Sequence, residues 1–374
     1  MDSHHSALLV AHAFQRWKRA LDAVRLTWRE GTDALPTDEH GSKRVSRRNR
    51  PRAATIRPSR ASDRNGPRSP RPVLGGALFV AIAAALWGTV GVASQFLYGN
   101  NDISPVVVGF VRLALASPLL LLLSVVTVGS RTFAFAGREL GAIVMIGITM
   151  ALYQLFYFTA VATTGVAIAT LVTICSAPLM VALIAGTVLG ERLTAPVIMA
   201  LVIGIVGTVI LVGFPSDVGA ARADVFAGTA WALGAAVSFA GFTLFSRVLA
   251  PHHHPFALIG IGLGTGALLL MPVALLHIPA SISTDGLWLL LYIAVVPTGF
   301  AYVVFFAGMK RAGATVASIA ALTEPLTATL LAWLFFDERL GGLGLIGAAL
   351  LVTAMLLLVR NAHSRGHATA QRAT

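Results

Sequence analysis

Charged residues are scarce in this chain. Asp, Glu, Lys and Arg make up 12% of its 374 residues, about half the share of an ordinary soluble domain. The scarcity is uneven, because residues 1–72 contain 16 Lys/Arg and 7 Asp/Glu, whereas residues 73–374 contain only 12 and 9. Since 56% of the chain is apolar, two soluble domains are excluded, and the composition predicts a polytopic membrane protein.

Cysteine and nucleotide-binding signals are also lacking. The single cysteine, Cys175, excludes an intramolecular disulfide framework and a multi-cysteine metal site. There is no G-x-x-x-x-G-K-[ST] loop to hold nucleotide phosphates, so ATP cannot drive a process through this chain alone. The triple histidine His252–His254 is interpreted as a solvated loop, because consecutive histidines do not converge on one metal. We predict no metal and no cofactor.

Long apolar runs are what the sequence does contain. Each is close to the roughly 20 residues that a helix needs to cross the hydrocarbon core, and they are too long and too uniformly apolar for barrel strands. The fold class predicted is therefore an all-α polytopic membrane protein with ten transmembrane helices. The runs are 73–97, 105–129, 140–162, 165–190, 193–214, 225–246, 256–276, 287–309, 314–336 and 341–359.

The distribution of Lys and Arg in the short loops predicts the orientation. With a cytoplasmic N-terminus, the outer loops contain only Arg222 and Arg339. The inner segments then contain Arg131, Arg138, Arg192, Arg247, Lys310, Arg311, Arg360, Arg365 and Arg372. We therefore expect a multi-pass protein of the cell membrane with both termini in the cytoplasm.

An internal repeat divides the membrane part. Pro178 is followed 13 residues later by Glu191-Arg192-Leu193, and Pro325 is followed at the same spacing by Glu338-Arg339-Leu340, an offset of 147 in both cases. Each copy has five helices, and because five is odd the second copy must be inverted, a recurring arrangement in transporters. The predicted domains are 73–214 and 225–360, flanked by cytoplasmic tails 1–72 and 361–374.

These segments resemble a known family. The stretch 297–340 (PTGFAYVVFFAGMKRAGATVASIAALTEPLTATLLAWLFFDERL) is similar to the second-repeat signature of the EamA branch of the drug/metabolite transporter superfamily, and 165–193 is similar to its first-repeat counterpart. Leu86-Trp87-Gly88 and Arg112 also fit. The resemblance covers 73–360 and implies ten helices as two inverted five-helix units. It also implies transport, often export, of amino acids, other small metabolites or drugs.

We therefore predict a secondary transporter, an exporter, that moves a small-molecule substrate across the cytoplasmic membrane by alternating access, and not an enzyme. One alternative is a membrane-embedded enzyme acting on lipid or isoprenoid substrates, although such an enzyme needs clustered catalytic groups. The other is a membrane scaffold or sensor that works through its basic tail.

Only two of the Asp, Glu, Lys and Arg residues beyond position 72 lie within a predicted span, and each is costly in lipid. Glu324 is interpreted as a carboxylate that accepts protons or pairs with a substrate amine in a central cavity. The alternative is a neutral carboxyl group that forms a hydrogen bond across helices beside Pro325. Arg112 is interpreted as a residue that reaches the outer interface or as a gate residue, with direct substrate contact as the alternative.

Uncharged polar and aromatic residues recur at helical spacing within the spans, where they could line a small-molecule site. The alternative is helix packing or an interfacial aromatic belt, which is the interpretation for Tyr98. Together with Glu324, the predicted substrate-binding residues are Trp87, Gln95, Tyr153, Gln154, Tyr157, Phe239, Thr243 and Tyr302.

Two further patterns receive structural interpretations. Glu191 and Glu338 end their helices beside Arg192 and Arg339, where a carboxylate is unfavourable for the helix dipole, so a local ion pair or cap is expected. The glycines spaced two apart in IGIGLGTGA, from 259 to 267, are attributed to close helix packing.

The basic tail is predicted to contain an amphipathic interfacial helix over 6–30 and a disordered segment over 41–72. Its charge favours anionic lipid. Nucleic acid is not a predicted partner, because no nucleic-acid-binding fold accompanies the charge. An alternative is that translation begins nearer Val73.

Overall fold

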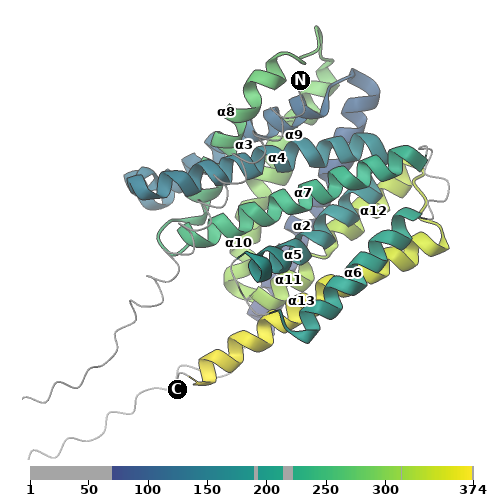
Figure 1. The fold of residues 1–374 in the computed structure, drawn as a ribbon. Coiled ribbons are helices and arrows are strands. Elements are labelled where there is room, and N and C mark those ends of the chain that lie inside the picture. The colour runs from purple at the N-terminus through teal and green to yellow at the C-terminus, as the bar shows by residue number, and fades with distance from the viewer. Residues whose placement is uncertain (1–69, 189–192, 214–221, 313, 373–374) are drawn as a thin grey trace, which may run out of the picture.

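The computed structural model describes residues 70–188, 193–213, 222–312 and 314–372, and every regular element in these ranges is helical (Figure 1). The amphipathic helix and disordered segment predicted in the tail lie outside the described residues, as do Glu191 and Arg192. Residues 70–72, which the sequence assigned to the tail, instead begin the first described helix.

The helices follow the predicted apolar runs with two exceptions, both of which fall in the second half of the chain. In chain order they are α2 (Pro70–Asn101), α3 (Pro105–Val128), the short η1 (Gly129–Phe133) and η2 (Gly137–Glu139), α4 (Leu140–Thr164), α5 (Val166–Thr187), α6 (Ala195–Gly213), α7 (Arg222–Leu249), α8 (Pro255–Leu275), α9 (Thr284–Ala294), η3 (Val295–Phe300), α10 (Ala301–Ala312), α11 (Ala314–Ala320), α12 (Thr323–Phe336) and α13 (Gly342–Arg372).

Seven helical segments in the described residues are long and apolar enough to cross a membrane. The segment 284–312, formed by α9, η3 and α10, counts as one of them. The apolar parts of α6 and α13 are shorter, at Ala195–Leu211 and Gly342–Leu358. The predicted run 314–336 is not one continuous helix, because it is interrupted between α11 and α12.

Pro325 lies just after the interruption between α11 and α12 and contributes to it. A proline has no N–H to donate four residues back and disfavours α-helical geometry in the residue before it. The carbonyl of Ala321 accepts instead from the backbone N–H of Glu324 at 3.0 Å. This tighter turn places Glu324 in the first turn of α12, rather than in the middle of an unbroken helix.

Pro297 lies in a second irregular turn, the π-helical segment η3. Its missing N–H leaves the carbonyl of Ile293 without its usual partner, and the hydroxyl of Thr298 donates to that carbonyl at 2.9 Å. Thr298 is 1% exposed. The wider turn therefore holds a polar side chain inside the bundle.

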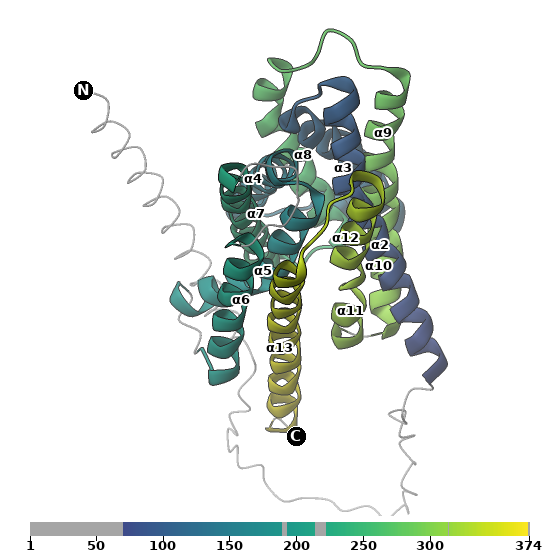
Figure 2. The ribbon, with the colours of Figure 1, turned by 90° about the vertical axis from the view of Figure 1, so that its right-hand side faces the viewer.

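The helices pack as a bundle in which sequence neighbours are not always spatial neighbours (Figure 2). Helix α2 packs against α10 and α12, α4 packs against α7, and α6 packs against α13. We call the end where α4 passes into α5 the Gly165 end, and the opposite end, where α7 finishes, the Arg247 end. The first described helix, α2, thus packs against helices from the second half of the chain.

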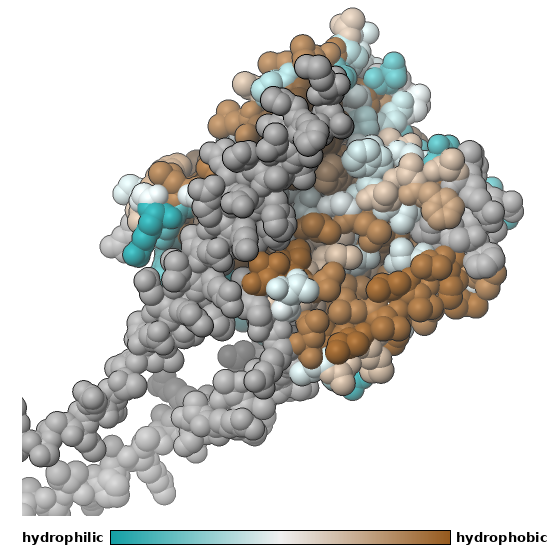
Figure 3. All heavy atoms as spheres, viewed as in Figure 1, coloured by the Kyte–Doolittle hydropathy of each residue, from teal (hydrophilic) through white to brown (hydrophobic). Residues whose placement is uncertain are grey.

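Helices α6 and α13 approach each other closely through glycines. A Cβ atom at Gly347 would lie 2.5 Å from the backbone nitrogen of Leu211, and one at Gly207 would lie 2.9 Å from the carbonyl oxygen of Gly347. Small residues let membrane helices pack at short range. Figure 3 shows apolar side chains gathered where this pair lies, and Val202, Ile205, Val209, Leu345 and Ile346 are among the exposed apolar residues.

Candidate functional site

A cavity of about 750 Å³ lies inside the bundle, within the range typical of small-molecule sites. It extends from the middle of the helices toward the Arg247 end, where its walls include Ala185, Val197, Arg247, Met309 and Leu358. Among the described helices, no lining residue lies within the last turn at the Gly165 end. The cavity is therefore asymmetric along the bundle axis.

Most of the side chains that the sequence singled out meet in this cavity, although they come from six separate elements. The lining includes Trp87, Arg112, Tyr153, Gln154, Tyr157, Phe239, Thr243, Tyr302 and Glu324. In lipid, polar side chains within helices are driven toward the protein interior. This explains why helical spacing alone selected residues that share a wall.

Gln95 is the exception. It lies eight residues beyond Trp87 on α2, toward the Gly165 end, and it is not part of the cavity wall. Its Oε1 atom is buried and has no hydrogen-bond partner in the described part of the chain. Gln95 is therefore not among the residues that line this cavity, and its contact with a substrate stays a prediction.

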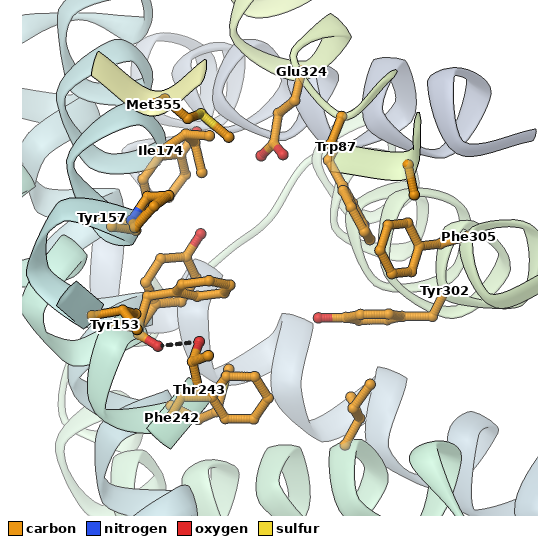
Figure 4. A pocket seen from close by; sticks show the side chains of 18 of the residues that line it. Trp87, Tyr153, Tyr157, Ile174, Phe242, Thr243, Tyr302, Phe305, Glu324 and Met355 are labelled. Carbon is orange, nitrogen blue, oxygen red and sulfur yellow. Dashed lines mark hydrogen bonds between the residues drawn. The ribbon is translucent and has the colours of Figure 1, made fainter. Parts of the chain in front are cut away.

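Aromatic rings form two facing groups in the cavity (Figure 4). On one side, Trp87 contacts Tyr302 edge-on at 5.4 Å between ring centroids and contacts Phe305 at 5.1 Å. On the other side, Tyr153 stacks on Tyr157 at 5.9 Å. These are ordinary distances for favourable aromatic pairs, and all of these rings line the cavity, where they offer apolar surface to a ligand.

Arg112 lies inside the bundle and not at an interface. Its Nε donates to Thr298 Oγ1 at 2.9 Å, and its Nη1 donates to Gln154 Oε1 at 3.1 Å. The expectation that its side chain reaches the outer surface is therefore corrected. Two of the five guanidinium N–H groups are used in these bonds, which fix the plane of the cation in the cavity wall.

Glu324 points its carboxyl group into the cavity (Figure 4). Its place in the first turn of α12 puts it at the positive end of the helix dipole, which favours a carboxylate. No ion pair joins Glu324 to Arg112 among the described residues. The middle of the cavity thus contains an acidic and a basic side chain that do not neutralise each other directly, and Arg247 adds a second basic side chain toward the Arg247 end.

Several cavity residues were missed by the sequence analysis. Phe305, Phe306 and Met309 lie three, four and seven residues beyond Tyr302 and line the same wall. This helical spacing is a signal that could have identified them. Thr298 lies four residues before Tyr302 and also lines the cavity, so the same spacing could have identified it.

The Gly165 end is closed by polar contacts between helices. The hydroxyl groups of Tyr157 and Thr170 lie 3.1 Å apart. The carboxylate of Glu338 accepts hydrogen bonds from the backbone N–H groups of Val166 at 2.9 Å and Ala167 at 2.8 Å. Tyr98, predicted to lie in an aromatic belt, donates to the carbonyl of Phe158 at 3.2 Å and is partly buried.

The local pairing predicted for Glu338 is wrong. Arg339 pairs instead with Asp337, at 2.9 Å between Nε and Oδ1. Glu338 is 8% exposed and is turned toward α5. Helix α12 has already ended at Phe336. The Glu338 carboxylate is turned to the N-terminus of α5, where the helix dipole favours a negative charge.

The triple histidine at the Arg247 end is only partly solvated. His253 Nε2 lies 3.1 Å from Glu139 Oε2, and its ring stacks on Phe135 at 4.2 Å. His254 Nδ1 accepts from the backbone N–H of Phe256 at 3.4 Å and caps α8. Burial and the nearby Lys310 lower the pKa of His254. The prediction of a solvated loop therefore holds for His252, which is exposed, but not for His253 and His254.

Comparisons with known proteins agree with this architecture. The EamA-like transporter family matches residues 74–213 and 226–360. Among curated proteins, the chain is 33% identical to the uncharacterized transporter YwfM of Bacillus subtilis over 297 residues, which cover 79% of this chain and 97% of that protein. It is 26% identical to Protein PecM of Dickeya dadantii, covering 75% of this chain and 91% of that protein.

A solved crystal structure has the same fold. It matches with a TM-score of 0.54 at 22% identity and covers 76% of this chain and 98% of its own. The two family matches coincide with the two halves related by the offset of 147. Together with the seven apolar helices, these findings describe a multi-pass membrane transporter. The chain belongs to the EamA-like transporter family.

Proposed function

We propose that this protein is a secondary transporter that moves a small amphiphilic metabolite across the cytoplasmic membrane by alternating access. The observation that carries the proposal is the cavity itself: it contains Arg112 and Glu324 between aromatic walls, and it extends toward one end of the bundle only. A cavity with access from one side is what an alternating-access cycle requires of each of its end states.

The architecture we propose is ten membrane-crossing segments arranged as two inverted five-helix repeats. The two family matches, at 74–213 and 226–360, support this division. The shorter apolar parts of α6 and α13 and the broken pair α11–α12 would supply the three segments beyond the seven long ones. Discontinuous helices next to a substrate site are common in inverted-repeat transporters.

The orientation we propose places both termini and the Arg247 end in the cytoplasm. Arg138, Arg247, Lys310 and Arg311 lie toward that end, and excess Lys and Arg favour the cytoplasmic side. In this orientation the cavity faces inward. A substrate to be exported would load from the cytoplasm in this conformation.

The chemistry of the cavity favours a substrate with two opposite charges and an apolar body. Arg112 is oriented by Thr298 and Gln154 and can bind a carboxylate with its remaining N–H groups. Glu324 can pair with an amine or accept a proton. The facing aromatic rings would contact the apolar part, so a zwitterion with an apolar side chain, such as an amino acid, fits the arrangement.

The test is uptake by the purified protein in reconstituted vesicles. Apolar amino acids would be compared with their methyl esters, which lack the anionic group, and with their N-acetyl forms, which lack the cationic group. We expect only the zwitterions to accumulate and to compete with one another. Equal uptake of all three forms would contradict the assignment of Arg112 and Glu324 to the two charged groups.

Proton coupling through Glu324 is tested separately. We expect Glu324→Gln to abolish the dependence of uptake on pH while substrate binding persists, because the amide cannot exchange a proton with the cavity. The conservative control is Thr243→Val, which alters the cavity wall without removing a titratable group. Uptake by Glu324→Gln that keeps its pH dependence would exclude this residue as the coupling site.

A further inference from the structure

A carboxylate outside the cavity joins the two halves of the chain at the Gly165 end. Glu338 lies in the loop between α12 and α13. Its Oε1 accepts from the N–H of Val166 and its Oε2 accepts from the N–H of Ala167. The partners are 172 and 171 positions apart in the chain, so this is a contact between the two matched family regions.

The environment of Glu338 differs from that of its neighbours in the same loop. Glu338 is 8% exposed, whereas the side chains of Asp337 and Arg339 are exposed and pair with each other. A buried carboxylate is costly unless it is hydrogen-bonded. Here two N–H groups and the positive end of the α5 dipole offset that cost.

Gly165 shapes the seat of this carboxylate. Its φ of +86° with ψ of 172° is a conformation available in practice only to glycine. A Cβ atom at this position would lie 2.7 Å from Glu338 Oε1. The absence of a side chain therefore lets the carboxylate approach the first N–H groups of α5.

The balance of forces on Glu338 suits a contact that forms and breaks. Burial raises the pKa of its carboxyl group, while the N–H groups of Ala167 and Val166 act in the opposite direction. Burial therefore costs the Glu338 carboxylate its hydration, and water that entered the Gly165 end would remove this cost. The two hydrogen bonds from α5 hold the carboxylate in its buried position.

The same two helices connect this contact to the cavity. α5 contributes Ile174 to the cavity wall and α12 contributes Glu324, and the helices pack against each other. At the Gly165 end, Glu338 connects the loop after α12 to the first N–H groups of α5. We propose that Glu338 is a latch that keeps the Gly165 end closed while the Arg247 end is open, and that its release accompanies opening of the Gly165 end. The latch rests on the alternating-access function proposed above.

The experiment measures access to two positions by cysteine labelling of the full chain in detergent, in a Cys175→Ala background. Ser94 lies one helical turn beyond the cavity residue Val90, toward the Gly165 end, and is 0% exposed. Thr243 lies in the open cavity wall. A water-soluble maleimide would be applied to the Ser94→Cys and Thr243→Cys proteins. In detergent both ends are reachable, so the result does not depend on membrane orientation.

We expect Glu338→Ala to raise the labelling rate of Ser94→Cys several-fold and to lower that of Thr243→Cys, because opening one end closes the other. Glu338→Gln keeps one acceptor oxygen, so its changes should have the same signs and be smaller. The matched control is Asp337→Asn. It alters an exposed carboxylate in the same loop, at a left-handed position that Asn tolerates, and it should change neither rate.

Unchanged labelling of Ser94→Cys in Glu338→Ala, in protein that elutes as the wild type does, would overturn the latch. A higher labelling rate of Ser94→Cys without a lower rate of Thr243→Cys would overturn the proposal that Glu338 couples the two ends. Glu338 would then be only a static cap on α5. Where Glu338→Ala aggregates, the Glu338→Gln protein decides between the same outcomes. Reciprocal labelling together with no uptake of any tested solute would contradict the proposed function but not the latch.

Discussion

Arg112 Nε donates a 2.9 Å hydrogen bond to Thr298 Oγ1, joining residues 186 positions apart. The same hydroxyl group donates to the carbonyl of Ile293. Pro297 cannot donate to this carbonyl because proline has no N–H. Pro297, in the second half of the chain, thus leaves a carbonyl free to accept from the Thr298 hydroxyl group. The same hydroxyl group orients Arg112 in the first half.

Thr298→Val should therefore weaken substrate binding without unfolding the protein, because valine keeps the shape but removes the acceptor. A hydrogen bond to a charged group contributes about 1.5–3 kcal/mol, so we expect KM for uptake in vesicles to rise about tenfold or more. Thr229→Val is the control, since the Thr229 hydroxyl donates to the carbonyl of Val225 on its own helix and Thr229 is not part of the cavity wall. Equal changes in KM for the two variants would contradict this orienting role.

The α6–α13 pair should depend on Gly347 and not on Gly344. A Cβ atom at Gly347 would meet the backbone of Leu211 at 2.5 Å, whereas one at Gly344 would have no neighbour nearer than 3.5 Å. Overpacking costs about 1–3 kcal/mol. We expect Gly347→Ala to lower Tm in detergent measurably and Gly344→Ala to leave it unchanged or slightly raised. Identical Tm values for the two variants would show that a methyl group at Gly347 does not disturb the contact between α6 and α13.

Gly165→Ala should act in the same direction as loss of Glu338. The backbone conformation at Gly165 costs an alanine about 1–3 kcal/mol, and the added methyl group would collide with the carboxylate. We expect faster labelling of Ser94→Cys and a lower Tm. Gly141→Ala, at a helical position with open space around it, should alter neither. Slow labelling in Gly165→Ala would mean that the carboxylate seat tolerates a side chain.

The stability of the Arg247 end should depend on pH through His254. Burial and the positive charge of Lys310 lower its pKa below the ordinary value of 6.5, so the folded protein favours the neutral ring that caps α8. The stabilisation is complete above pH 6.5 and is lost as the pH falls through the lowered pKa. Thermal unfolding across this range should show a smaller slope in His254→Asn, which caps the helix without titrating. His252→Gln, at an exposed site, should keep the wild-type slope.

The two repeat prolines illustrate how far sequence reasoning extends. Pro178 and Pro325 occupy equivalent positions of the repeat, and both lie in apolar runs of similar length. Pro178 lies inside the continuous helix α5, whereas Pro325 follows a break between α11 and α12. The local pattern is the same in both cases. The local pattern therefore does not decide whether a helix continues through its proline.

The sequence by itself determined the class of the protein and most of the cavity wall. Long apolar runs predict membrane helices, and polar or ionisable residues within them, such as Tyr153 and Glu324, are expected to face inward because lipid offers them no partner. Only the tertiary structure decided that Arg112 is held by Thr298, that Gln95 lies beyond the cavity and that Glu338 caps α5. Helical periodicity says which face of a helix is polar, but it cannot say which distant residue that face will meet.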